Sequence, residues 1–83
     1  MTQDELKAIV VGIEVDARGT ACPGPLLEAK RVAAEVASGN VMVVLSTDEG
    51  TPVDIKRWSK KMGHDYLGEF QEDGVWRVYL KIK

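Results

Sequence analysis

The last eight residues of the chain constrain the fold most, because apolar and polar side chains alternate there without interruption. A period of two is typical of a strand with one buried face. The apolar positions are Trp76, Val78, Leu80 and Ile82. Such a strand must pair with a neighbour and be covered by a second layer, so the chain must fold around a sheet.

A turn motif directly before this strand predicts a hairpin. Residues 72–74, with the sequence Glu-Asp-Gly, fit a three-residue loop with the glycine in the left-handed conformation. This loop gives the cross-strand pairs Trp76–Phe70, Leu80–Tyr66 and Arg77–Glu69. A two-residue turn at Asp73-Gly74 would mix apolar and polar side chains on one face, because it opposes Trp76 with Gln71. We therefore expect the three-residue loop.

Four further elements are predicted before the hairpin. Alternation over residues 11–16 indicates a half-buried strand, and the branched apolar run at 41–45 indicates an inner strand. Apolar residues recur every three or four positions from 22 to 37, which predicts a helix. A second helix is expected to end at Gly63 and to begin at Thr51, as the N-cap of a capping box that Asp54 completes.

The predicted order of elements is strand, helix, strand, helix, strand, strand. Right-handed crossover connections then give an α/β (α+β) two-layer sandwich: a four-stranded mixed sheet with both helices on one face. The open face is expected to carry Met42, Val44, Leu67 and Tyr79. An 83-residue chain has room for one core, so we expect a single domain over residues 10–83. Before it we expect a flexible N-terminal arm over residues 1–9, with room for a helical turn from Asp4 to Ala8.

Composition excludes several classes of function. A net charge of −2 argues against stable binding to nucleic acid, which needs excess positive charge. One cysteine and one histidine argue against a metal site. No apolar run approaches the roughly 20 residues that span a bilayer, and the first five residues are acidic rather than basic. We expect a cytoplasmic protein without a membrane segment.

The cysteine of this chain, Cys22, stands between the first predicted strand and the first predicted helix. Prolines suit the first turn of a helix, and a thiol held at the positive end of the helix dipole has a lowered pKa. Arg18 would add positive charge, and the free backbone amides of Gly24 and Leu26 would point at the sulfur. The alternative is a buried, inert cysteine. The residues expected to shape this loop are Arg18, Gly19, Pro23, Gly24 and Pro25.

The run Asp16-x-Arg18-Gly19-x-x-Cys22-Pro23-x-Pro25 resembles the signature of the TusA/SirA/YedF family of small sulfur carriers. The likeness extends from about residue 14 to the end of the chain. Later positions that carry it are Asp48, Thr51, Asp54, Ile55, Trp58, Gly63 and His64. The chain departs from the best-known tRNA-pathway members at Ala21, where those proteins have a basic residue, which puts the pathway in doubt. The resemblance implies the same βαβαββ fold.

The resemblance also implies a function, namely sulfur relay, with Cys22 as the catalytic residue. Cys22 would accept a sulfane sulfur as a transient persulfide and pass it on, without any other cofactor. The implied donor is a cysteine desulfurase, a rhodanese-like or a DsrE-like protein, and the acceptor bears a thiol. Implied pathways are tRNA thiolation, molybdenum cofactor synthesis and sulfur oxidation. Such a sulfurtransferase, a monomer or weak dimer, would turn over little without its partners.

The lack of a second cysteine favours a carrier over a redox enzyme, because a persulfide on Cys22 cannot be resolved as an internal disulfide. Two alternatives remain open. In the first, the chain is a regulatory or protein-interaction module, and Cys22 is structural. In the second, it is a peroxide-reducing thiol protein, which the missing resolving cysteine disfavours.

Other polar residues are candidates for supporting roles. Asp48 is expected either to support the Cys22 loop or to form an ordinary turn. A basic cluster on the second helix would dock an acidic partner or would form a solvated face. The residues of this cluster are Lys56, Arg57, Lys60 and Lys61. His64 would either form a catalytic pair with Cys22 or, as we expect, lie on the surface beside the helix stop at Gly63 and far from Cys22.

Overall fold

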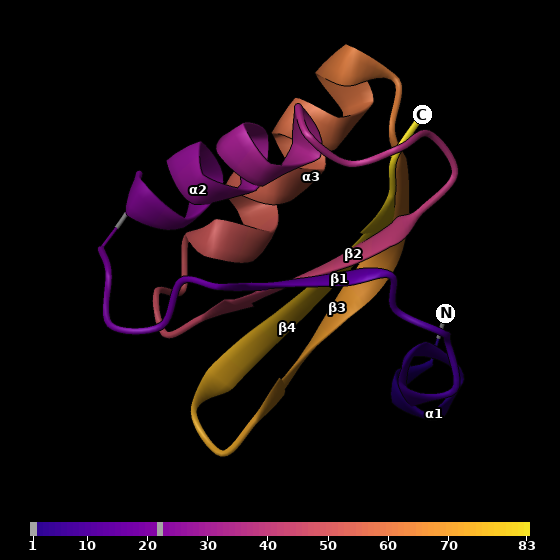
Figure 1. The fold of residues 1–83 in the computed structure, drawn as a ribbon. Coiled ribbons are helices and arrows are strands. Elements are labelled where there is room, and N and C mark those ends of the chain that lie inside the picture. Colours follow the sequence, from indigo (N-terminus) through magenta and orange to yellow (C-terminus); the bar gives the residue numbers. More distant parts are fainter. Residues whose placement is uncertain (1, 22) are drawn as a thin grey trace.

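The computed structural model describes residues 2–21 and 23–83, which form a single four-stranded sheet with helices on both faces (Figure 1). The elements are α1 (Gln3–Lys7), β1 (Ile13–Asp16), α2 (Gly24–Ala33), β2 (Val41–Ser46), α3 (Thr51–Met62), β3 (Asp65–Glu72) and β4 (Val75–Lys81). The strand order is β1-β2-β4-β3, with β1 parallel to β2 and the other pairs antiparallel. The predicted mixed sheet with two helices, α2 and α3, on one face is confirmed. No helix among the described residues is long and apolar enough to cross a membrane.

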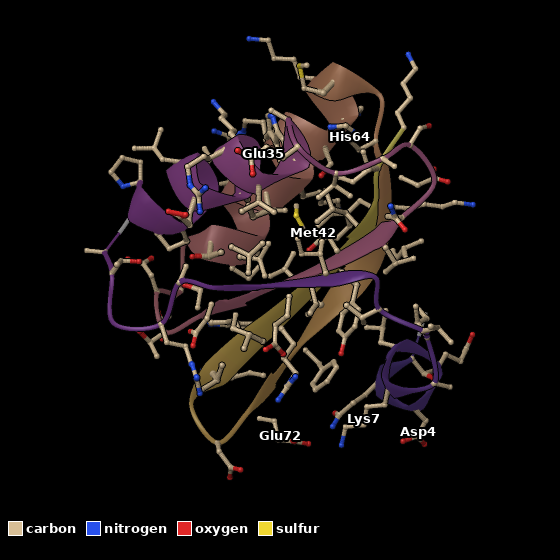
Figure 2. All side chains as sticks on the ribbon, in the orientation of Figure 1. Asp4, Lys7, Glu35, Met42, His64 and Glu72 are labelled. Atoms are coloured by element: carbon tan, nitrogen blue, oxygen red, sulfur yellow. The ribbon has the colours of Figure 1, made fainter. Side chains whose placement is uncertain are left out.

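The main core lies between the sheet and the α2–α3 layer. Met42 and Val44 of β2 pair with Leu80 and Val78 of β4, and all four side chains are fully buried in this core. Figure 2 shows Met42 between the sheet and the helices. The prediction that Met42 and Val44 lie on the open face is therefore wrong. The run at 41–45 is apolar throughout, so it has no alternation from which the inward face can be read.

The opposite face of the sheet carries a second, smaller core covered by α1. Leu6 of α1 is 1% exposed, and Lys7 forms an ion pair with Glu72 of β3 at 2.6 Å (Figure 2). Residues 1–9, expected as a flexible arm, thus include a helix whose apolar side chain packs on the sheet. The sheet residues buried in this core are Val43, Leu45, Phe70 and Tyr79, with Leu67 partly buried beside them. The predicted placement of Leu67 and Tyr79 on this face is confirmed.

The hairpin turn differs from the prediction. Glu72 pairs with Val75, so the turn has two residues, Asp73 (φ +53°) and Gly74 (φ +77°), both left-handed. Trp76 therefore opposes Gln71, not Phe70. A register shift between Tyr66 and Gly68 changes the pairing farther along, so that Tyr66 pairs with Leu80 as predicted. The predicted pairing of Glu69 with Arg77 is also wrong, because Arg77 opposes Phe70.

The ends of both long helices differ from the predicted ends. The α2 helix ends at Ala33 rather than Ala37. In the turn that follows, the Glu35 amide donates to the Val32 carbonyl at 3.0 Å, and the Val36 amide donates to the Ala33 carbonyl at 3.4 Å. The α3 helix ends at Met62, and Gly63 caps it in the left-handed conformation, as predicted. Its N-cap, however, is Gly50 rather than Thr51. Thr51 is 1% exposed, and its hydroxyl instead bonds to Ser46 Oγ at 2.7 Å.

Candidate functional site

The candidate site lies at the edge of the sheet where β1 and β2 both end. Because these strands are parallel, the loops that follow them leave the sheet side by side. The loops enclose a shallow pocket of about 250 Å³, lined by Gly19, Thr20, Ala21, Thr47 and Asp48. Cys22 itself lies outside the described residues. In the sequence it falls between Ala21, which lines this pocket, and Pro23, which precedes α2.

Hydrogen bonds within the β1–α2 loop brace the chain on both sides of position 22. The Ala17 amide donates to the Leu45 carbonyl at 2.9 Å, which continues the strand pairing by one residue. The Thr20 hydroxyl donates to the Ala17 carbonyl at 2.7 Å, and the Gly24 amide donates to the Ala21 carbonyl at 2.7 Å. The Gly24 amide is thus bonded to the Ala21 carbonyl, so the expectation that this amide points at the Cys22 sulfur is wrong.

Glycines allow the close turns of this loop. Gly19 has φ of +83°, a conformation that side chains disfavour, and it turns the chain away from β1. A Cβ on Gly24 would lie 3.1 Å from Thr20 Cβ, so a side chain at Gly24 would push the loop off the start of α2. Larger residues at these two positions would therefore strain or displace the loop.

The prolines lie at the start of α2, as expected. Pro23 is the N-cap, and Pro25 follows Gly24 in the first turn. Pro25 is fully buried. Both residues lack an amide hydrogen, and neither interrupts the helical hydrogen bonds here. They stiffen the backbone at the positive end of the α2 dipole.

Arg18 forms a forked ion pair with Asp16 rather than standing as an unpaired cation. Arg18 Nε and Nη2 donate to the two carboxylate oxygens of Asp16 at 2.8 and 2.7 Å, and the Arg18 amide donates at 3.2 Å. These bonds hold the pKa of Asp16 at about 2, below its ordinary value of 3.8. The positive charge expected from Arg18 near Cys22 is thus largely balanced by Asp16.

Asp48 organises the second loop of the site. Its Oδ1 accepts the Gly50 amide at 2.8 Å, and its own amide donates to Ser46 Oγ at 3.0 Å. Ser46 in turn bonds to Thr51, so a buried hydroxyl pair anchors this loop at the end of β2. Asp48 is a candidate from the sequence, whereas Ser46 and Thr47 were missed. Their position directly after a buried strand, beside a parallel neighbour, is the signal that points to them.

The predicted basic cluster of α3 is divided between different surroundings. Arg57 and Lys61 line a groove between α2 and α3, and Lys56 Nζ lies 5.8 Å from the centre of the Tyr66 ring. Lys60 shares the last turn of α3 with Lys61. Lys30 of α2, which was missed from the sequence, lines the same groove. The basic charges that face the groove therefore come from two helices.

His64 lies at the far end of the groove from the pocket. The helix that separates them, α3, has 12 residues and is roughly 18 Å long. His64 is half-buried, with its ring 5.0 Å from that of Trp58, and its Nδ1 accepts the Lys83 amide at 3.0 Å. Packing and this bond hold the ring beside the helix cap at Gly63. Its contacts are structural.

Possible metal ligands do not gather at the site. Within residues 2–21 and 23–83, no group of three or more histidine, aspartate or glutamate side chains could hold a metal ion. The lining of the pocket consists of backbone, the Ala21 methyl group, two hydroxyl groups and the Asp48 carboxylate. Such groups can orient a loop and bind polar atoms.

Comparison with known proteins identifies the family. The family described as "Sulfurtransferase TusA" matches residues 13–82. An Archaeoglobus fulgidus protein named "Putative sulfur carrier protein" is 44% identical over 83% of this chain and 94% of its own. The sulfur carrier protein TusA of Allochromatium vinosum is 34% identical over 82% of this chain and 90% of its own. The crystal structure of a SirA-like protein from Desulfitobacterium hafniense matches with a TM-score of 0.75 at 30% identity, covering 83% of this chain and 95% of that one. The chain therefore belongs to the TusA family of sulfurtransferases.

Proposed function

We propose that this protein is a sulfur carrier that takes up sulfane sulfur as a persulfide on Cys22 and passes it to an acceptor. The observation that carries the proposal is the position of Cys22 in the chain. It falls between a residue that lines the pocket at the sheet edge, Ala21, and the N-cap of α2, Pro23. The names of the relatives, sulfur carriers, support the same role.

The reaction consists of two exchanges at sulfur. The Cys22 thiolate attacks the outer sulfur of a donor persulfide; a new S–S bond forms, and the donor S–S bond breaks with its electron pair left on the donor thiolate. The outer sulfur carries its proton to Cys22. An acceptor thiolate then attacks that outer sulfur, and Cys22 is released as thiolate. Each step conserves electrons, so no redox cofactor is required.

The surroundings of Cys22 in the chain favour this chemistry. A helix begins directly after it, and the positive end of a helix dipole stabilises a thiolate relative to a thiol. The loop is braced by hydrogen bonds before position 22, at Thr20, and after it, at Gly24. A braced loop loses less conformational entropy when a donor thiolate and Cys22 meet.

The partners that we propose follow from the same chemistry. The donor is a persulfide-bearing protein such as a cysteine desulfurase, a rhodanese-like or a DsrE-like protein. The acceptor is a protein thiol, in tRNA thiolation, molybdenum cofactor synthesis or sulfur oxidation. We place the carrier in the cytoplasm, where thiols stay reduced. We assign docking of these partners to the basic residues of α3 beside the groove.

The decisive experiment is sulfur loading followed by intact-mass measurement. The full chain is incubated with glutathione persulfide, and one added sulfur atom is expected in the wild type but not in Cys22→Ser. The loaded protein should then lose that sulfur to a thiol acceptor. A wild-type protein that gains no sulfur, or a Cys22→Ser variant that gains as much, would contradict the proposal. Rapid consumption of peroxide with sulfenic acid on Cys22 would instead indicate a peroxide-reducing thiol.

A further inference from the structure

At the point where the β1–α2 loop leaves the sheet, the backbone hydrogen bonds between β1 and β2 end. The next hydrogen bond between the two segments is made to a side chain. The last ladder bond joins the Ala17 amide to the Leu45 carbonyl at 2.9 Å. Two residues farther along each strand, the Gly19 amide donates to Thr47 Oγ1 at 3.1 Å. The Thr47 hydroxyl thus takes the place that a backbone carbonyl would have if β1 and β2 continued as paired strands.

This bond joins the two loops that enclose the pocket. Gly19 and Thr47 both line it, from opposite loops. Gly19 lies at the left-handed turn, φ +83°, from which the chain runs through Thr20 and Ala21 to Cys22. Beyond Gly19, the loop is braced mainly against itself and α2, by the bonds from Thr20 and Gly24. The bond at Gly19 therefore sets where the loop and the start of α2 lie relative to β2.

We infer that Thr47 is a positioning residue for sulfur transfer: its hydroxyl accepts the Gly19 amide and holds the loop that carries Cys22 against the pocket. This inference rests on the proposed sulfur-carrier function and adds to it a residue outside the Cys-Pro-x-Pro motif. Thr47 is exposed, so water replaces it readily as the partner of the Gly19 amide. Loss of the hydroxyl should therefore disturb the loop without unfolding the domain.

The test uses two substitutions at one position. Thr47→Val keeps the shape of the side chain and removes the acceptor, whereas Thr47→Ser keeps the acceptor and removes the methyl group. We expect Thr47→Val to load sulfur from glutathione persulfide about two- to tenfold more slowly, the range of one lost neutral hydrogen bond. Thr47→Ser should load at close to the wild-type rate. Both variants should keep the wild-type melting temperature.

Equal loading rates in Thr47→Val and the wild type would overturn the inference. Equal slowing in Thr47→Val and Thr47→Ser would also overturn it, because the methyl group and not the hydroxyl would then matter. The pH profile of Cys22 alkylation by iodoacetamide provides a readout that needs no persulfide. Without the Gly19 bond, the loop and the start of α2 should shift together relative to β2 and the pocket. The surroundings of the thiol then change, so the pH midpoint should shift in Thr47→Val but not in Thr47→Ser.

The alkylation readout separates this inference from the proposed function. If the wild type takes up no sulfur from glutathione persulfide, the sulfur-carrier proposal fails. The alkylation profile then decides alone whether Thr47 positions Cys22. An unchanged midpoint in Thr47→Val would overturn the positioning role, and a shifted midpoint that returns to the wild-type value in Thr47→Ser would support it.

Discussion

Leu6 of α1 lies directly against Gly68 of β3. A Cβ on Gly68 would lie 3.2 Å from a methyl carbon of Leu6, and Gly68 has φ of +148°, a conformation that glycine adopts far more readily than other residues. The register shift of β3 falls at this same point, between Tyr66 and Gly68. The family match begins at residue 13, so α1 lies outside the matched segment and uses the β3 irregularity as its docking point.

Gly68→Ala should destabilise the protein by about 1–3 kcal/mol, because alanine must adopt a strained backbone and displace Leu6. Gly74→Ala is the matched control in the same hairpin. Gly74 has φ of +77°, and a Cβ added there would meet no other atom within 4 Å, so only the backbone cost of about 1–2 kcal/mol applies. Urea unfolding measures both changes. A cost for Gly68→Ala no greater than that for Gly74→Ala would refute the Leu6 contact.

The pKa of Asp16 should depend on Arg18. In the wild type, NMR titration of the carboxyl carbon should give a midpoint of about 2, because Arg18 donates to both carboxylate oxygens. Arg18→Gln should return the midpoint toward 3.8. Since the folded pKa is lowered, this pair stabilises the fold above the unfolded pKa, and the contribution is lost as the pH falls from near 4 through 2. The same midpoint in both proteins would show that the forked pair does not persist in solution.

The order of elements was readable from the sequence because each pattern is local. Alternation, helical spacing and glycine stops each depend on neighbouring residues, and together they predicted the βαβαββ order and the left-handed Gly63 cap. The Cys-Pro-x-Pro motif also predicted the site loop, although Cys22 itself lies outside the described residues.

The errors arose where the structure depends on contacts between distant residues. The two-residue turn at Asp73-Gly74 leaves Gln71 and Glu69 exposed on edge strand β3, where the hairpin extends past the helices (Figure 1). The register shift before Gly68 then restores the pairing of Tyr66 with Leu80. No local pattern marks such an irregularity. In the sequence, Thr51 fits the N-cap of a capping box. In the structure Thr51 is buried next to Ser46, and its hydroxyl bonds to Ser46 instead.

The buried hydroxyl pair Ser46–Thr51 should show energetic coupling. Thr51→Val removes the hydroxyl that lies 2.7 Å from Ser46 Oγ. The free energy of unfolding should fall by about 1–3 kcal/mol. Ser46→Ala also removes the acceptor of the Asp48 amide, so it should cost more. The double variant should lose less than the sum of the single variants. Urea unfolding of all four proteins measures this cycle, and simple additivity would exclude a direct bond.

Transfer from a protein donor should depend on the groove-facing charges of α3 more than on Lys56. Arg57→Glu and Lys61→Glu reverse charges that line the groove, and each should slow sulfur transfer from a persulfide-loaded cysteine desulfurase by about tenfold at low salt. Lys56→Glu is the matched control, because Lys56 lies over Tyr66 instead. Loading from glutathione persulfide should be nearly unchanged in all three variants, since this small donor needs no docking surface. The difference should shrink as salt screens the charges. Equal slowing in all three variants would show that net charge, and not the groove, steers the donor.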